Sequence, residues 1–309
     1  MALTFAALGF VVANLALSLF VIALWPAVRT SPHRSLTLFL MRLIPAAGSA
    51  ALVVGVILPA FLFFEPKRTD ESGGIALAVF AVLAAGLAGA GLYRGIASWR
   101  KTRRLERAWM TVALDETPSG VAAPAYRVRC DSAFAVALGV FRPRLYVSDR
   151  FLHTLTEGER RSVFAHEAGH VVSFDNLKRT LMAFAPDGLS LTRTGREIES
   201  AWRLAAEDEA DDHAAGADRA GALDLASALI KALRLAPAPC GSAMSFCGEA
   251  TVARRVARLL SDDLPASHAA EHRHPAIWVA LAVVGLAVLA GPALRASYAI
   301  TETALTHLR

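Results

Sequence analysis

Four long apolar stretches constrain this chain more than any other feature of its sequence. They cover about residues 4–25, 36–64, 75–99 and 276–294, and their only charged residues, Arg42 and Arg94, lie near the ends of their stretches. A helix needs about 20 apolar residues to cross the hydrocarbon core of a bilayer. The sequence therefore predicts four transmembrane helices. A composition of 55% hydrophobic and 19% charged residues also excludes an ordinary soluble protein and a disordered one.

Basic residues beside the first and third stretches predict the topology. Arg29 and Arg34 follow the first stretch, and a basic cluster between Arg100 and Arg107 follows the third. Because cytoplasmic loops carry an excess of Lys and Arg, both segments should face the cytoplasm, with the N- and C-termini outside. The net charge of +5 is thus mostly juxtamembrane. It indicates contact with the lipid bilayer and argues against direct nucleic-acid binding.

Three regions follow from this topology: transmembrane helices within residues 1–99, a cytosolic domain at 100–275, and a fourth transmembrane helix with a short external tail at 276–309. Within the domain, alternating patterns between turn residues predict strands at 126–130, 133–138 and 144–148, after a turn-rich linker at 115–124. Helical patterns follow at 156–174, 196–215, 220–235 and 249–260, after a polar helix at 100–114. The predicted fold is an α-helical membrane protein with an added cytosolic α+β domain.

The helix predicted at 156–174 carries the strongest chemical motif. Thr156 and Glu159 have the spacing of a capping box, which begins a helix. His166-Glu-Ala-Gly-His170 follows on that helix, so the two histidines share a face and can bind one zinc ion. Glu167 lies between them, where it can take a proton from water and deliver it to a leaving amine.

A catalytic zinc site needs a third protein ligand and an open position for water. The run Glu207-Asp-Glu-Ala-Asp211 lies on a later predicted helix, with Glu207 and Asp211 on one face. We assign Glu207 as the third ligand. We assign Asp211 to orient a ligand histidine through a hydrogen bond. Read alone, such an acidic run would be a solvated helix face.

These motifs resemble the gluzincin metalloproteases, and most closely the BlaR/MecR-type membrane metallopeptidases of bacterial antibiotic sensing. The resemblance rests on the lead-in from Phe134 to Ser148, on the zinc motif followed by Asp175-Asn176, and on three apolar stretches before the domain and one after it. It implies one zinc ion per chain and a location in the bacterial cytoplasmic membrane. That family's sensors carry a large external penicillin-binding domain after the last span, whereas only 296–309 remain here. The resemblance therefore does not extend to β-lactam sensing.

The resemblance also implies a residue that stabilises the transition state beside zinc, for which His213, Arg254 and Arg255 are the candidates. Asp175 matches the family pattern, with helix capping or packing as its alternative role. The expected activity is hydrolysis of a protein substrate, either a cytosolic transcriptional repressor or the chain itself. The substrate peptide should pair with an edge strand from the 133–148 region.

Two alternative functions remain open. HtpX/Ste24-type membrane peptidases share the zinc motif and the Glu-x-x-Ala-Asp pattern, and their resemblance implies a quality-control protease. The other alternative is a signal transducer without catalysis, in which the zinc site is structural. The sequence leaves the oligomeric state open, a homo-oligomer included.

Overall fold

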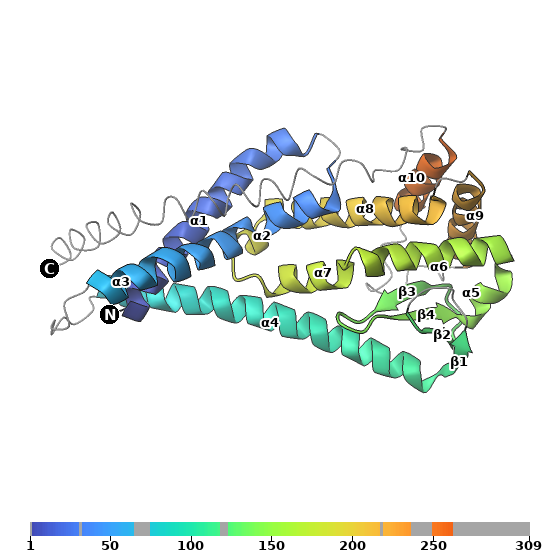
Figure 1. Ribbon diagram of the computed structural model, residues 1–309, viewed down its shortest axis with the longest axis horizontal. Helices are drawn as coiled ribbons and strands as arrows, with labels where there is room; N and C mark the ends of the chain where they lie inside the picture. The colour runs from blue at the N-terminus through green and yellow to red at the C-terminus, as the bar shows by residue number, and fades with distance from the viewer. Residues whose placement is uncertain are drawn as a thin grey trace. The chain divides into compact units, whose positions relative to one another are not determined.

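A computed structural model describes residues 2–30, 33–64, 75–117, 123–216, 219–235 and 249–261. These ranges are mainly helical, with one small sheet (Figure 1). The helices are α1 (Ala2–Val28), α2 (Ser35–Leu52), a π-helical turn (Val53–Ile57), α3 (Leu58–Phe64), α4 (Ile75–Thr111), α5 (Asp149–Thr154), α6 (Glu157–Val172), α7 (Asp175–Phe184), a 3₁₀ turn (Leu189–Leu191), α8 (Arg193–Ala215), α9 (Arg219–Leu235) and α10 (Glu249–Leu260). The strands are β1 (Ala113–Thr117), β2 (Ala125–Val128), β3 (Ala135–Leu138) and β4 (Arg144–Ser148).

Three helical segments are long and apolar enough to cross a membrane: Leu3–Val28, Ser35–Phe61 and Leu77–Thr111. They coincide with the first three predicted spans, and the second runs from α2 through the π-helical turn into α3. The fourth predicted span, at 276–294, lies outside the described residues. The orientation of the spans in the membrane stays a prediction.

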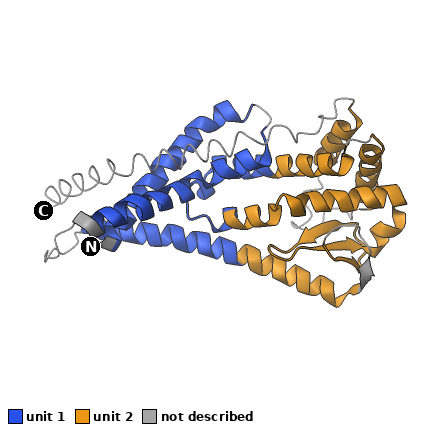
Figure 2. Cartoon of the chain, viewed as in Figure 1, with its two compact units in different colours: residues 1–96, 182–202, 271–309 blue, residues 97–181, 203–270 orange. Residues whose placement is uncertain are grey.

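The chain divides into two compact units (Figure 2). Unit 1 includes Met1–Ile96 and Met182–Trp202, and unit 2 comprises Ala97–Leu181 and Arg203–Ala270. The apolar helices therefore share a unit with a segment from the middle of the chain. Helices α4, α7 and α8 each have residues in both units.

Polar contacts hold that middle segment within unit 1. The Arg42 guanidinium, fully buried, donates to Asp187 and Glu199, each at 2.9 Å. The Asn14 amide donates to the carbonyl of Pro186 at 3.1 Å and accepts from the backbone N–H of Gly188, also at 3.1 Å. A charge buried among apolar helices is tolerated only when it is paired, and these contacts supply the pairing.

Unit 2 contains a four-stranded sheet in the order β1-β2-β4-β3. Strands β2 and β4 are parallel, whereas β1 pairs antiparallel with β2 and β3 antiparallel with β4. The sequence pattern predicted the last three strands, but β1 falls largely within the segment predicted as a turn-rich linker. Strand β3 is an edge of the sheet, as the predicted substrate-binding strand has to be.

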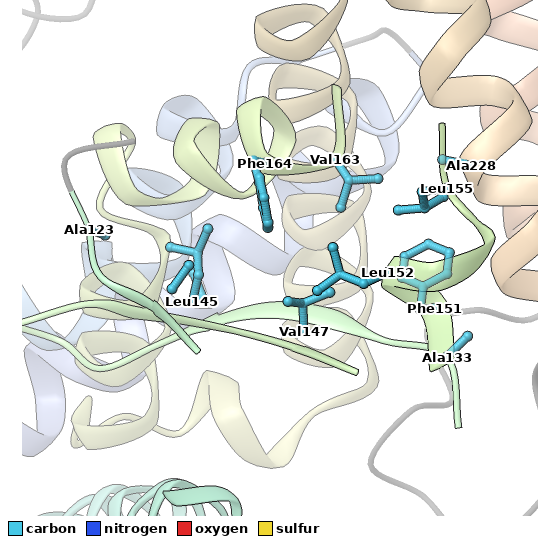
Figure 3. Packing of buried hydrophobic residues seen from close by; sticks show 12 residues of the cluster. Ala123, Ala133, Leu145, Val147, Phe151, Leu152, Leu155, Val163, Phe164 and Ala228 are labelled. Atoms are coloured by element: carbon cyan, nitrogen blue, oxygen red, sulfur yellow. The ribbon is translucent and has the colours of Figure 1, made fainter. Parts of the chain in front are cut away.

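Apolar side chains fix helix α6 against the sheet (Figure 3). Val163 and Phe164 of α6 belong to a buried cluster with Leu145 and Val147 of β4 and with Leu152 of α5. The capping box predicted at Thr156 and Glu159 is present. The histidines therefore sit on a helix that is fixed at its start and along one face.

Helix α6 ends at Val172, two residues earlier than predicted. The chain turns at Phe174, whose φ of 55° is in the left-handed region, where a non-glycine residue is uncommon. Helix α7 begins at the next residue, and the sequence pattern did not predict it. This turn brings Asp175 back toward the residues of the zinc motif.

Candidate metal centre

The structure brings together the three predicted metal ligands. His166 and His170 of α6 and Glu207 of α8 each offer a ligand atom, and these atoms all lie within 4.8 Å of one another. The Nε2 atoms of His166 and His170 lie 3.6 Å and 3.7 Å from the Glu207 carboxylate oxygens. Helical spacing accounts for the two histidines, and the packing of α8 supplies the glutamate. The three side chains could hold one metal ion.

The other ring nitrogen of each histidine faces a carboxylate. His166 Nδ1 lies 3.0 Å from Asp211, which is fully buried, and His170 Nδ1 donates to Asp175 at 2.8 Å. A carboxylate at Nδ1 fixes the proton there and leaves Nε2 free to bind a metal. Asp211 was predicted in this place. Asp175 contacts a proposed ligand, so its role goes beyond the capping or packing that the sequence allowed.

A glycine lets the two ligand-bearing helices approach each other. A Cβ atom on Gly169 of α6 would lie 3.1 Å from the Cα of Ala210 and 3.2 Å from the Cβ of His213, both on α8. Such contacts are tighter than ordinary van der Waals packing. Glycine at this position of the motif therefore permits the spacing that lets Glu207 meet the histidines.

Arg255 of α10 contacts both carboxylates of the cluster. Its Nη1 lies 2.8 Å from Glu207, and its Nε donates to Asp211 at 2.8 Å. The side chain is 7% exposed, so these are buried, charge-assisted contacts. Arg255 was one of three candidates for a stabiliser of the transition state, and the structure places its guanidinium on the carboxylates of Glu207 and Asp211.

The two other predicted stabilisers are not brought to the cluster. Arg254 forms two hydrogen bonds with Asp208, each 2.9 Å long, and its side chain is 40% exposed. His213 is exposed, and among the described residues it forms no hydrogen bond or ion pair. Neither side chain therefore bonds His166, His170 or Glu207 among the described residues, and a role for either in the reaction stays a prediction.

Glu167, the proposed proton carrier, is buried beside the edge strand. Its Oε2 accepts a hydrogen bond of 2.7 Å from the backbone N–H of Ala137 in β3. A backbone donor at this distance holds the carboxylate in one orientation. An oriented carboxylate beside two histidines that could hold a metal is suited to accept a proton from water.

Electrostatics within the metal-free cluster favour a charged histidine. Burial alone would lower the pKa of His166, but its contacts with Asp211 and Glu207 outweigh burial and raise that pKa to about 10. Burial opposes ionisation of Glu207 and Asp211 as well, yet the contacts with His166 and Arg255 hold both pKa values below their ordinary range. Because a metal binds the neutral imidazole, metal binding must displace the His166 proton.

Sequence reasoning missed two polar side chains of α7. Asn176 donates to the backbone carbonyls of Ala137 in β3 and of Gly139 just after it. Arg179 carries a positive charge near Glu207, Asp175 and Glu167, all of which act to raise its pKa. Desolvation is the largest influence on Arg179 and, together with Arg203, lowers that pKa overall. Asp175-Asn176 was visible as part of a motif, but its contacts depend on a helix that the sequence pattern did not predict.

Comparison with known families gives one match. Residues 100–195 match the family model of Peptidase family M48. The matched segment contains the sheet, the zinc motif on α6 and helix α7, and it ends before Glu207. No curated protein matches the chain. The M48 match points to a metallopeptidase, and the apolar helices point to one that is anchored in a membrane.

Proposed function

We propose that this protein is a membrane-anchored zinc endopeptidase. The observation that carries the proposal is the convergence of His166, His170 and Glu207, with Glu167 buried on the same helix as the histidines. Two imidazoles and one carboxylate form a donor set that zinc takes in catalytic sites, with a position left open. The carboxylates at both Nδ1 atoms fit this assignment because they prepare Nε2 for a metal.

Each residue of the site can be given a role in the hydrolysis of a peptide bond. Zinc, when bound, would act as a Lewis acid that polarises the scissile carbonyl and acidifies water. Glu167 accepts a proton from the attacking water and donates it to the nitrogen of the leaving amine. Asp175 and Asp211 hold the two histidines, and Arg255 neutralises the carboxylates on its side of the cluster.

The cellular role that we propose is regulatory proteolysis at the cytosolic face of the bacterial membrane. The BlaR/MecR-type resemblance supports this role, with a repressor or the chain itself as substrate. The M48 match agrees equally with a quality-control protease. Sequencing of new protein N-termini in cells with induced expression separates the two, because regulation predicts one defined site and quality control predicts many sites in membrane proteins.

Glu167→Gln tests the catalytic proposal itself. It should lower the cleavage rate about 10²–10⁴-fold while the zinc content stays unchanged, since Glu167 is not a ligand. Glu157→Gln is the matched control, because Glu157 lies on the same helix but is 68% exposed. Full cleavage by the Glu167→Gln protein would refute the role of Glu167 as proton carrier, whereas the transducer without catalysis predicts no cleavage by either the variant or the unchanged protein.

A further inference from the structure

Few backbone N–H and C=O groups of strand β3 point to its open edge, where a further strand could pair. The carbonyl of Phe134 accepts from the N–H of Ser148 at 2.9 Å, so this pair belongs to the ladder with β4. Hydrogen-bonded pairs alternate in an antiparallel ladder. Val136 and Leu138 therefore also face β4, whereas Ala135 and Ala137 turn their N–H and C=O groups to the open edge.

Both outward groups of Ala137 are already used. Its N–H donates to Glu167 at 2.7 Å, and its carbonyl accepts from Nδ2 of Asn176 at 2.9 Å. The same Nδ2 donates to the carbonyl of Gly139 at 3.1 Å. A side-chain amide has two N–H donors, and Asn176 donates both to carbonyls at the C-terminal end of β3.

Asn176 thereby joins the strand to the metal centre. It follows Asp175 in the first turn of α7, and Asp175 binds the Nδ1 of His170. Two consecutive residues thus hold a proposed metal ligand and the edge strand. A change at Asn176 should release β3 without touching any metal ligand.

Ala135 is the next residue toward the start of β3 whose backbone groups face outward. Among the described residues these two groups have no hydrogen-bond partner outside the sheet. An extended peptide that adds to a sheet edge needs an N–H and a C=O of this kind. The two hydrogen bonds of Ala137, to Glu167 and to Asn176, are called the latch below. The latch determines where along β3 such a peptide can pair.

We propose that Asn176 is a positioning residue that holds β3 so that Ala137 orients Glu167 and Ala135 stays open to pair with an extended peptide substrate. The proposal rests on the proposed peptidase function for its substrate. The strand contact itself is independent of that function, so the two can be tested separately. Neither the motif nor the family match assigns a role to Asn176.

Three variants of the full chain in detergent test the latch. Asn176→Ala removes both donors, and Asn176→Asp keeps the size but places a carboxylate oxygen against two carbonyls. Thr180→Ala is the control, because Thr180 lies one turn later on α7 and its hydroxyl donates to the backbone carbonyl of Asn176 within the helix, and not to β3. A packing role for Asn176 predicts that Asp is tolerated better than Ala, whereas the latch predicts the reverse order.

Hydrogen–deuterium exchange of the zinc-loaded protein gives the readout that needs no activity. The peptide covering 133–142 should exchange at least about tenfold faster in Asn176→Ala, because this segment loses the two hydrogen bonds donated by the Asn176 side chain. It should exchange faster still in Asn176→Asp. Exchange in 157–172 should stay as in the unchanged protein. Protection of 133–142 equal to that of the control, or faster exchange over all of unit 2, would overturn the proposal.

Cleavage of fluorescein-labelled casein supplies the second readout. The Asn176 variants should lose about tenfold or more in kcat/KM, with a rise in KM and with zinc affinity unchanged, whereas Thr180→Ala should not. If casein is cut equally well by all variants, the positioning role is wrong although the peptidase function stands. If no variant and no unchanged protein cuts casein or any cellular protein, the peptidase function fails and the exchange readout still decides the latch.

Discussion

Arg255→Leu tests how the carboxylates of the metal centre are held. The change removes one guanidinium that contacts Glu207 at 2.8 Å and Asp211 at 2.8 Å, in a site where Arg255 is 7% exposed and Asp211 is fully buried. Leucine fills a similar space but offers no donor. In the metal-free protein, the change thus leaves Asp211 in contact with His166, and Glu207 with His166 and the charge of Arg179 nearby.

The size of the effect follows from burial. Removing one partner of a buried ion pair costs about 3–5 kcal/mol, because the remaining charge is uncompensated. Glu207 is 29% exposed and His166 still lies 3.0 Å from Asp211, so the lower end applies. We expect the free energy of unfolding to fall by about 3 kcal/mol, which is about a hundredfold in the unfolding equilibrium.

Arg254→Leu is the matched control for this prediction. Arg254 is the neighbouring residue on α10, and its bonds to Asp208 are at the surface. An exposed ion pair of this kind contributes about 0–1 kcal/mol. Both variants are compared as metal-free full chains in detergent, by urea titration with pulse proteolysis as the measure of unfolding.

A double variant checks the cause. Arg255→Leu combined with Asp211→Leu replaces the buried pair with apolar side chains, so the loss should be smaller than the sum of the two single losses. An Arg255→Leu protein that is no less stable than Arg254→Leu would refute the reasoning. Simple addition of the two single losses would refute the pairing of Arg255 with Asp211.

Three further predictions concern pH, the metal and the membrane unit. Because the pKa of His166 in the folded protein is raised to about 10 from 6.5, its stabilising contribution should be complete below pH 6.5 and disappear as pH rises toward 10. The melting temperature of the metal-free protein should therefore fall over that interval. Zinc binding at pH 7 should release about one proton, which calorimetry in two buffers of different ionisation enthalpy measures. Asp175→Asn should weaken zinc binding about 10–100-fold in competition with a chelator, and unchanged affinity would argue against its contact with His170. Arg42→Leu should destabilise unit 1 by about 3–5 kcal/mol because it leaves Asp187 buried without its partner, and adding Asp187→Asn should recover part of the loss in thermal unfolding.

The regular elements could largely be predicted from sequence. Helix α10 has the bounds that its pattern predicted, and α6 begins at its predicted capping box. Local patterns succeed here because the hydrophobic period of a helix is set within a few neighbouring residues. Helix α7 was missed because the turn before it needs a positive φ at Phe174, which a non-glycine residue does not signal. Strand β1 was missed because it is defined by its pairing with β2, a contact that its own sequence does not encode.

The candidate site shows the same division. His166, His170 and Glu207 could be selected because their spacing on helices is a local property. The contacts of Asp175, Asn176 and Arg255 could not, since each joins elements that only meet after folding. Arg254 and Arg255 are adjacent in sequence, and only packing against α8 decides which of them is buried on the metal centre.

The sequence by itself thus determined that the chain has helices long and apolar enough to cross a membrane, and a helix with two histidines placed to share a metal ion. Length, apolar composition and a spacing of four residues are sufficient for those conclusions. Tertiary structure alone decided that residues 182–202 join the apolar helices through Arg42, and that the edge of β3 is held by Glu167 and Asn176. Such partners are far apart along the chain, and a buried polar group is satisfied by whichever donor or acceptor the fold brings to it.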